Sequence, residues 1–457
     1  MTEQSREGWP ERLCLGRPEH RAWALYDWAN SAMVTVVVTA IFPAYFRSVV
    51  AADLTSQVAS RYFTGATVLS MLLVAFASPL LGAYADFRAV RKRLLVFFLA
   101  LGVVSTAGLF LVGPGDVALA AVLFGLANIG ASGSFVFYDA LLPHVARGDQ
   151  VDRLSTTAYA LGYLGGGLLL ALNLAWIQRP DLFGLPTGEA LTPAEATLPV
   201  RLAFLSVAVW WAVFSIPLLL RVPEPPRELE ADEESDDSPI RTAFTRLGET
   251  LRELRSYRQA FLMMLAFLLY NDGIGTIIRM SVFFGGLLEL DESVMIGSIL
   301  VVQFVGVPAA LVFGKLAAHV GTKRAILVGL AAYVGITMMA FGLETDRDFL
   351  FLALAVGAVM GGTQALSRSL FASLIPAHKS TEFFGLFAVL EKFAGVAGPA
   401  LFGLVAGFVD DPRWAILVIL PMFIGGGFVL LRVDVESGRS AAAASERGLR
   451  STDQSKK

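Results

Sequence analysis

Long apolar stretches alternate with short polar segments along almost the whole chain. Each stretch holds about 20 predominantly apolar residues, which is the length that a helix needs to cross the hydrocarbon core of a bilayer. The pattern therefore predicts an all-α membrane protein. We predict twelve membrane-spanning helices, at Ala22–Phe46, Tyr62–Ala85, Leu94–Val112, Val117–Leu142, Thr157–Trp176, Leu202–Leu220, Ala260–Leu288, Met295–Ala318, Ala325–Gly342, Phe349–Phe371, Phe384–Phe408 and Trp414–Leu431.

A hydrophilic segment divides the predicted spans into two sets of six. It contains the Pro-rich, acidic sequence PEPPRELEADEESDDSP and continues with leucines at helical spacing among arginines. The first part is typical of a solvated linker, and the second predicts an amphipathic helix on the membrane surface or a solvated linker helix. We predict a cytoplasmic tail at 1–21, an N-terminal six-helix bundle at 22–220, this linker at 221–259, a C-terminal six-helix bundle at 260–432 and a disordered cytoplasmic tail at 433–457.

The two sets of six spans resemble each other in sequence. Tyr26-Asp27 in the first span is matched by Tyr270-Asn271 in the seventh, and LLPH after the fourth span is matched by LIPAH after the tenth. Duplicated halves are typical of transporters in which two bundles rock around a central site. The sequence therefore predicts two pseudo-symmetric six-helix halves.

The composition excludes several other classes of protein. Apolar residues make up 55% of the chain and charged residues only 16%, whereas soluble domains carry about 25% charged residues. A soluble enzyme, a collagen-like chain and a disordered chain are excluded. Cys14 is the single cysteine, and neither a phosphate-binding GxxxxGK[ST] pattern nor a zinc-binding HExxH pattern occurs. We expect no enzymatic activity, no cofactor, no bound metal and no nucleic-acid partner.

Lys and Arg indicate the orientation in the membrane. They are concentrated in the N-terminal tail, in every second loop and in the C-terminal tail, and they are sparse in the other loops. Cytoplasmic segments carry such an excess of basic residues. We predict a multi-pass protein of the cell (inner) membrane with both termini in the cytoplasm.

One loop has the composition of a gate. In GAYADFRAVRKRL, Gly82 permits a close helix contact, and Asp86 at the membrane edge is able to accept hydrogen bonds from a neighbouring helix or to pair with Arg91. A merely charged inner loop is the alternative. The related loop in the second half has Ala318 in place of the aspartate, so only the first loop is expected to supply a carboxylate. We expect Asp86 to contact the start of the eleventh span, near Thr381.

This loop resembles the gating motif of the major facilitator superfamily, although Ala89 and Val90 replace its second glycine and first arginine. Six longer segments of the chain are WALYDWANSA, FVFYDALLPHVA, YALGYLGGGLLL, FLLYNDGIGTIIRM, GGTQALSRSLFASLIP and EFFGLFAVLEKFAGVAGP. Together they resemble one branch of that superfamily, which includes the autophagy-linked vacuolar amino-acid effluxers of fungi and many bacterial permeases. The resemblance implies the major facilitator fold, a central cavity lined by spans 1, 4, 7 and 10, and efflux or uptake of neutral amino acids. Asp139 stands where this family is expected to have asparagine.

Polar residues inside the spans are the candidates for substrate binding and ion coupling. Ionisable groups are unfavourable inside a membrane, so they usually face a cavity or a partner. We predict Asp272 as the proton-coupling group, with a structural ion pair to Arg279 as the alternative. Arg368 either binds a substrate carboxylate or extends to the cytoplasmic surface as an anchor, and we prefer the anchor. The whole set is Asp27, Asn30, Asn128, Asp139, Asn271, Asp272, Arg279, Gln364, Arg368, Glu391 and Lys392.

Purely structural roles are expected for several polar and aromatic residues of the spans. Asn128, Asn271 and Gln364 are expected to join helices by hydrogen bonds rather than to bind substrate. Trp23, Trp176 and Trp414 lie at span ends and are expected to be anchors at the membrane interface.

These features together predict a secondary active transporter. We expect it to move a small solute, with a neutral amino acid as the expected class, by alternating access and with protons as the coupling ion. We expect it to act as a monomer whose partners are this substrate, protons and the lipid bilayer. The alternative is a transporter-like membrane sensor or receptor that carries out no net transport.

Overall fold

The computed structural model describes residues 11, 13–188, 190–226, 257–288, 290–406, 408–409, 411 and 413–455. The predicted amphipathic helix of the linker lies outside the described residues. Helices dominate the described chain, and eleven of those formed by described residues are long and apolar enough to cross a membrane. A further helix, α16 (Ser380–Ala406), has 27 residues and takes the place of the eleventh predicted span. The prediction of an all-α membrane protein is confirmed.

The N-terminal half begins with a long composite helix, in which α2 (Pro18–Ala32) continues through the π-helical η2 (Met33–Ile41), α3 (Phe42–Tyr45) and η3 (Phe46–Val50). Proline at the first position of α2 suits a helix start, because that residue has no internal partner for an N–H group. The other elements of this half are α4 (Ser56–Arg88), α5 (Arg91–Gly108), η4 (Leu109–Leu111), α6 (Val117–Ala140), α7 (Leu142–Val145), α8 (Asp149–Gln178), η5 (Pro180–Phe183), α9 (Pro193–Ala196) and α10 (Leu198–Arg221).

The C-terminal half repeats this order. Its α15 (Asp346–Ser373) starts with a capping box. The Thr345 hydroxyl accepts a hydrogen bond from the backbone N–H group of Asp348, and the Asp348 carboxylate accepts one from the backbone N–H group of Thr345. The other elements are α12 (Arg258–Leu287), α13 (Glu292–Val320), α14 (Thr322–Phe341), η6 (Ala377–Lys379), α16 (Ser380–Ala406), α17 (Arg413–Ile416), η7 (Leu417–Ile419), α18 (Leu420–Leu431) and α19 (Val435–Ser455).

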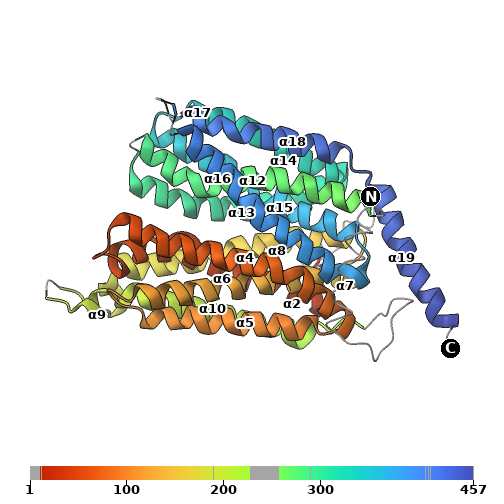
Figure 1. Cartoon of the computed structure of the whole chain (residues 1–457), viewed down its shortest axis with the longest axis horizontal. Coiled ribbons are helices and arrows are strands. Elements are labelled where there is room, and N and C mark those ends of the chain that lie inside the picture. Colours follow the sequence, from red (N-terminus) through yellow and green to blue (C-terminus); the bar gives the residue numbers. More distant parts are fainter. Residues whose placement is uncertain are drawn as a thin grey trace.

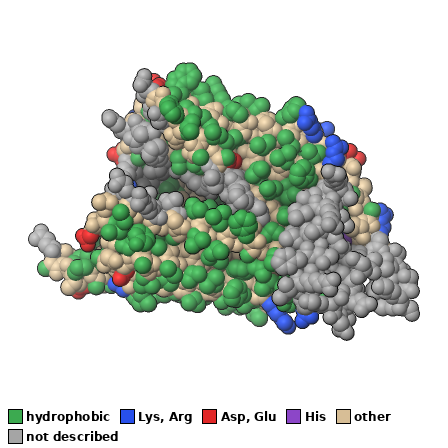
Figure 2. Space-filling view, in the orientation of Figure 1, with side chains coloured by type: hydrophobic (Ala, Val, Ile, Leu, Met, Phe, Trp, Pro, Cys, Tyr) green, Lys and Arg blue, Asp and Glu red, His purple; other side chains and the backbone are tan. Residues whose placement is uncertain are grey.

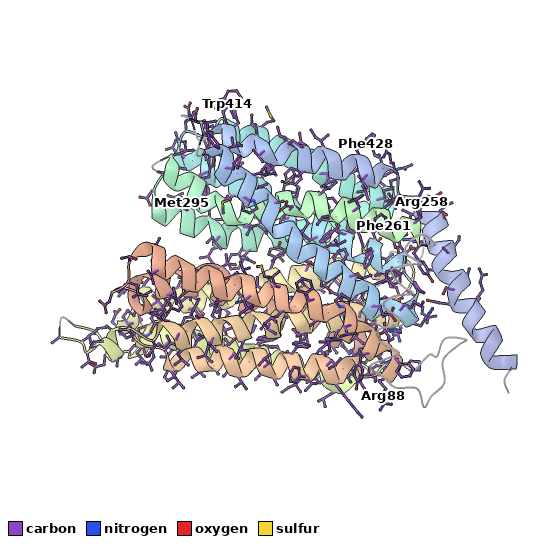
Figure 3. All side chains as sticks on the ribbon, in the orientation of Figure 1. Arg88, Arg258, Phe261, Met295, Trp414 and Phe428 are labelled. Carbon is purple, nitrogen blue, oxygen red and sulfur yellow. The ribbon has the colours of Figure 1, made fainter. Side chains whose placement is uncertain are left out.

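The two halves lie one above the other with their helices roughly parallel to a common direction (Figure 1). The start of α2 and the helix α19, near the two ends of the described chain, lie at the same end of this bundle, which we call the inner end; the opposite end is the outer end. Hydrophobic side chains cover much of the visible surface between the two ends, while Lys and Arg side chains gather at the inner end (Figure 2). Arg88 and Arg258 lie at the inner end and Trp414 at the outer end (Figure 3). This distribution suits a bilayer around the middle of the bundle.

One pair of lysines repeats between the halves. Lys92, in the first turn of α5, donates from its ammonium group to the carbonyl oxygen atoms of Leu219 and Val222 at the end of α10. Lys323, in the first turn of α14, donates in the same way to Leu431 and Val433 at the end of α18. A cation is favourable beside the unpaired carbonyl groups at a helix C-terminus. The internal repeat seen in the sequence thus extends to individual contacts.

The C-terminal tail differs from the expectation. Residues 433–457 were expected to be disordered, but α19 forms a helix over Val435–Ser455. Its Ser445 accepts a hydrogen bond from the Tyr257 hydroxyl, and its Glu446 accepts one from the backbone of Ala377. Alanine is the best helix former, and the run of alanines at 441–444 favours this helix despite its polar surroundings.

Candidate functional site

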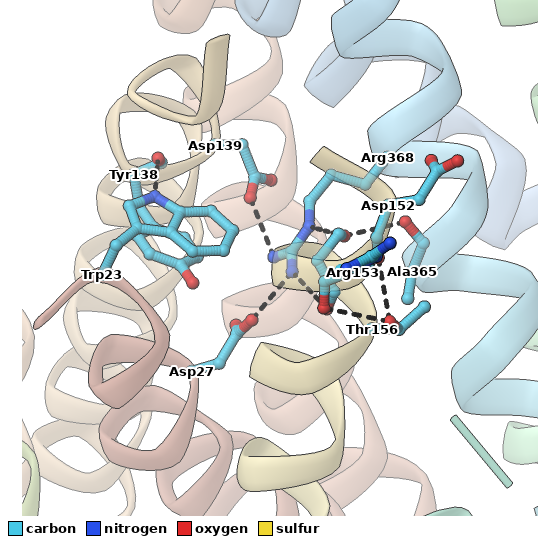
Figure 4. A network of polar contacts seen from close by, with 10 residues as sticks. Trp23, Asp27, Tyr138, Asp139, Asp152, Arg153, Thr156, Ala365 and Arg368 are labelled. Carbon is cyan, nitrogen blue, oxygen red and sulfur yellow. Dashed lines mark hydrogen bonds and ion pairs between the residues drawn. The ribbon is translucent and has the colours of Figure 1, made fainter. Parts of the chain in front are cut away.

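Arg368 is the centre of a buried polar network that joins the two halves (Figure 4). It lies on α15, and only 4% of its surface is exposed. Its Nη2 atom donates to Asp27 of α2 at 2.9 Å, and its Nη1 atom donates to Asp139 of α6 at 3.1 Å. Its Nε atom donates to the hydroxyl of Ser155 on α8 at 3.0 Å. One side chain of the C-terminal half therefore holds three helices of the N-terminal half.

Aromatic rings surround the same guanidinium group. The ring centres of Tyr159 and Trp23 lie 4.5 and 4.9 Å from its central carbon atom. Trp23 stacks on Tyr138 and donates from its indole nitrogen to the Tyr138 carbonyl oxygen. A cation is attracted to the face of an aromatic ring, and this attraction is stronger when water is excluded. The rings thus stabilise the buried charge.

Two expectations about this region are wrong. Arg368 does not extend to the surface as an anchor, because two carboxylates and a hydroxyl hold its guanidinium group inside the protein. Trp23 is fully buried and is not an anchor at the membrane interface. Trp414 at the outer end is exposed, as expected of an anchor.

The two carboxylates that hold Arg368 differ in exposure. The Asp27 side chain is 6% exposed and the Asp139 side chain is 20% exposed. Both act electrostatically on the guanidinium group. One positive charge therefore faces two carboxylates, of which Asp139 is the more accessible.

A second polar contact between the halves was not predicted from the sequence. Asp152 of α8 accepts hydrogen bonds from the hydroxyl groups of Ser369 on α15 and Thr322 on α14. One turn further along α8, the Ser155 hydroxyl donates to the Ala365 carbonyl oxygen at 2.8 Å. The polar run DRLSTT at the start of the fifth span was the available signal. Such a run is equally typical of an ordinary helix start, so it did not single out Asp152.

The predicted gate residues lie together at the inner end. The Asp86 carboxylate accepts hydrogen bonds from the backbone N–H groups of Thr381 and Glu382, at 3.0 and 3.1 Å. These groups belong to the first turn of α16, where N–H groups have no partner within the helix and the helix dipole favours a negative charge. Arg91 pairs with Asp86 at 2.6 Å and donates to the Thr381 hydroxyl at 3.0 Å. The structure thus has the contact that was expected between Asp86 and the start of the eleventh span.

The backbone around the gate explains its two unusual positions. A Cβ atom at Gly82 would lie 2.5 Å from the Thr381 carbonyl oxygen, so only glycine fits this close approach. Ala89 has a φ of 51° and a ψ of 53°, the left-handed conformation that glycine adopts without strain. Alanine at this position therefore holds a backbone conformation that favours glycine.

Asp272 makes a contact with α16 that was not predicted from the sequence. Its carboxylate accepts a hydrogen bond from the backbone N–H group of Gly398 on α16 at 2.8 Å. Pro399 follows this glycine inside the helix and has no N–H group to donate. Asp272 thus joins α12 to α16 within the C-terminal half and is buried there. The side chain of its expected partner, Arg279, lies outside the described residues.

The remaining candidates divide into three groups. Asn30 donates to the Ser134 hydroxyl at 3.3 Å and Asn128 donates to the Phe124 carbonyl oxygen at 2.9 Å, so both make contacts within the N-terminal half. Two others are partly exposed, and the side chains of the last two lie outside the described residues. The partly exposed residues are Asn271 and Gln364, and the undescribed side chains are those of Glu391 and Lys392.

The hydrogen bonds between the halves gather at the inner end. They join α4 to α16, α8 to α14 and α15, and α15 to α2 and α6. All these contacts would have to break if the halves separated at this end. The structure is therefore closed at its inner end.

Comparison with known proteins identifies relatives over most of the chain. The family model described as "Vacuole effluxer Atg22 like" matches residues 48–443. The chain is 34% identical over 420 residues to the MFS-type transporter YxiO of Bacillus subtilis (strain 168), covering 92% of this chain and 95% of that protein. It is 29% identical over 326 residues to autophagy-related protein 22 of Yarrowia lipolytica, covering 65% of this chain and 52% of that protein. The chain thus spans about half the length of this fungal relative.

Solved structures share the fold at low sequence identity. The transporter FucP in its outward conformation matches with a TM-score of 0.68 at 11% identity, covering 92% of this chain and 100% of that chain. The human organic anion transporter MFSD10 matches with a TM-score of 0.68 at 14% identity, covering 93% of this chain and 100% of that chain. These matches confirm that the chain has the fold of these transporters.

Proposed function

The chain belongs to the vacuole effluxer Atg22-like family within the major facilitator superfamily of transporters, and on this basis we propose that it is a proton-coupled carrier of neutral amino acids. It is a membrane transporter and not an enzyme. The proposal concerns its substrate, its coupling ion and the residues that couple them. The cross-half pairing of Arg368 with Asp27 and Asp139 carries the proposal.

The charges around Arg368 match those of a zwitterion. An amino acid carries a carboxylate and an ammonium group a few ångströms apart. A guanidinium group binds a carboxylate through two parallel hydrogen bonds, and a carboxylate accepts hydrogen bonds from an ammonium group. In the closed inner end these protein groups bind one another. An amino acid would satisfy both when the halves part, with its carboxylate on Arg368 and its ammonium group on Asp139 or Asp27.

A proton would act on the same pairing. The described carboxylates that pair with Arg368 carry two negative charges against its one positive charge. Protonation of either carboxylate weakens its attraction for the guanidinium group and so favours separation of the halves. Asp139 is the more exposed of the two and is the natural point of proton entry. Protonation and opening of the inner end would thus be linked.

Asp27 is the candidate for coupling whose described contacts cross the boundary between the halves. The described hydrogen bond of Asp272, from the backbone of Gly398, stays within one half, so a rigid rocking of the halves does not break that bond. The hydrogen bond of Asp27 crosses between the halves, and the same motion must break it. A coupling group has to interact differently in the two states of the carrier. We therefore assign coupling to Asp27, with Asp139 as its assistant.

Counterflow with purified protein tests the substrate class. Proteoliposomes loaded with unlabelled leucine should take up radiolabelled neutral amino acids from outside, while acidic amino acids and xylose should exchange much more slowly. The Arg147→Gln variant, which changes an exposed arginine at the inner end, is a matched control and should keep this exchange. Absence of exchange for every neutral amino acid at millimolar concentration would reject the assignment. Exchange of a sugar in its place would reassign the substrate.

A further inference from the structure

We propose that Asp152 forms a second inner latch, in which a carboxylate of the N-terminal half again accepts hydrogen bonds from the C-terminal half. The inference rests on the proposed alternating-access function, because a latch has a role only where the halves separate. It assigns to Asp152, Thr322 and Ser369 the role of holding the two halves together at the inner end, which was not predicted from the sequence.

The two sides of the bundle have related contacts at the inner end. Gly82 on α4 lies against the start of α16, and a Cβ atom there would meet the Thr381 carbonyl oxygen at 2.5 Å. Gly314 on α13 lies against α8, and a Cβ atom there would meet the Thr156 hydroxyl at 2.5 Å. Each half thus presents a glycine to a helix of the other half. The internal repeat thus gives two related interfaces between the halves.

The two interfaces differ in which helix carries the carboxylate. In the first it lies on the same helix as the glycine, and in the second it lies on the helix that faces the glycine. Four residues after Gly82 comes Asp86, which accepts hydrogen bonds from α16 across the interface. Four residues after Gly314 comes Ala318, which has no polar side chain. On this side the carboxylate is Asp152, one turn before Thr156 on the facing helix. The N-terminal half therefore supplies the acceptor in both interfaces, and in both the C-terminal half supplies the donors that reach it across the boundary.

The donors of the second interface also follow the repeat. The contacts of Lys92 and Lys323 align α5 with α14, which makes Thr322 the counterpart of Arg91 as the first residue of its helix. Arg91 pairs with Asp86, and the Thr322 hydroxyl donates to Asp152. In the second interface the carboxylate lies on the facing helix α8, and the hydroxyl group of Thr322 takes the place that the guanidinium group of Arg91 has in the first interface.

Burial gives these contacts their strength. Ser369 has no exposed surface, and Thr322 is also buried. Hydrogen bonds to an ionised carboxylate are roughly twice as strong as those between neutral groups, and a low dielectric strengthens them. The Asp152 contacts bind α8 to both α14 and α15, so they exist only while the inner end is closed. Asp152 thus favours the state in which the inner end is closed, independently of Asp86.

Distance measurements between spin labels test the second latch. Arg93→Cys and Arg324→Cys place labels on exposed, related positions of the two halves at the inner end, in a Cys14→Ser background. Asp152→Asn should raise the ratio of long to short distances by about tenfold, because it exchanges charge-assisted hydrogen bonds for neutral ones. Asp149→Asn removes an exposed carboxylate from the same first turn of α8 and should leave the ratio unchanged.

A second variant keeps the test decisive if Asp152→Asn does not fold. Thr322→Val removes a donor from the other half, leaves Asp152 in place and should shift the ratio in the same direction. A lower melting temperature in these variants with an unchanged distance ratio would overturn the proposal and leave a purely structural role. The distances need no substrate, so a shift without amino-acid counterflow would uphold the latch and reject the proposed substrate. Counterflow of amino acids without a shift in the distance ratio would uphold the proposed substrate and reject the latch.

Discussion

The guanidinium group of Arg368 donates a hydrogen bond of 2.9 Å to the carboxylate of Asp27, although the two residues lie 341 positions apart in the sequence. One residue belongs to α15 and the other to α2, so the bond crosses the boundary between the halves. Both side chains are nearly inaccessible to solvent. Separation of the halves at the inner end must therefore break a buried ion pair or replace it with another partner.

Removal of the Arg368 charge should destabilise the protein more than removal of the whole pair. Arg368→Gln removes the cation that pairs with the buried carboxylate of Asp27 and with Asp139, which should cost about 3–5 kcal/mol of stability. Addition of Asp27→Asn to this variant removes one stranded charge and should recover a large part of the loss. Thermal unfolding of the detergent-solubilised protein measures both effects. Equal melting temperatures for the single and double variants would contradict a paired charge in the native state.

Loss of the Asp86 charge should weaken the first latch without unfolding the protein. Asp86→Asn keeps one acceptor oxygen but removes the charge that faces the first turn of α16 and Arg91. We expect near-normal expression, transport reduced by roughly tenfold, and faster labelling of cysteines placed at the inner interface. Uptake assays and labelling rates check this. Transport at the normal rate would show that the contact does not act as a latch.

Replacement of Ala89 by glycine should stabilise the loop between α4 and α5. The residue has a φ of 51°, and this conformation costs a residue with a Cβ atom about 1–2 kcal/mol more than it costs glycine. The greater freedom of glycine in the unfolded chain offsets about 0.4–1 kcal/mol of this gain. Ala89→Gly should therefore raise the melting temperature slightly, whereas Ala77→Gly inside α4 should lower it. A lower melting temperature for Ala89→Gly would contradict the strained conformation.

The parts of this molecule that depend on local sequence were predictable. Apolar runs of sufficient length specify spanning helices wherever they occur, and Gly82, Asp86 and Arg91 lie within one short segment of the chain at the junction of α4 and α5. The contact of Asp86 with Thr381 and Glu382 was also predictable, because these two residues lie at the start of a helix, where backbone N–H groups need an acceptor. These features need no knowledge of how the halves are placed.

The parts that depend on how the halves meet were not predictable. The partners of Arg368 come from three other helices, and they face it only when the inner end is closed. Trp23 occupies a span end, where an interfacial anchor and a buried ring look the same in sequence. The polar composition of α19 resembles that of a disordered tail, and its contacts with Tyr257 and Ala377 become visible only in the fold.

Cys14 should react slowly with maleimide in the native protein. It is buried, its Sγ atom lies 3.2 Å from Nδ1 of His20, and burial raises the pKa of its thiol above the usual 9.0. The thiolate is the reactive form, so a raised pKa lowers the reactive fraction at neutral pH. The labelling rate should therefore still rise between pH 8 and pH 10, roughly tenfold for each unit below the pKa. A rate that levels off below pH 9 would contradict this environment.

Burial also makes Cys14 a poor reporter of orientation, because slow labelling from outside would follow from either topology. Exposed positions in a Cys14→Ser background are better reporters. With an impermeant maleimide on intact cells, Leu182→Cys at the outer end should react, and Arg93→Cys at the inner end should react only after the cells are opened. The opposite pattern would reverse the predicted orientation.

Coupling of transport to protons through the Arg368 pairing is the central claim, and two substitutions of equal size around this guanidinium group separate it from a structural role. Asp27→Asn removes the most buried carboxylate of the pairing, and Asp139→Asn introduces the residue that is expected at this place in the family. Both should fold, since each leaves Arg368 one charged partner.

The decisive measurement is accumulation of a neutral amino acid in proteoliposomes under an imposed pH gradient, with counterflow measured on the same preparations. The wild-type protein should accumulate substrate until a protonophore is added, and Asp139→Asn, which keeps the coupling carboxylate of Asp27 but loses the point of proton entry, should accumulate it more slowly. Asp27→Asn should lose accumulation but keep counterflow, because exchange needs no net movement of protons. Accumulation by Asp27→Asn at the wild-type level would contradict the account and remove Asp27 from the coupling step.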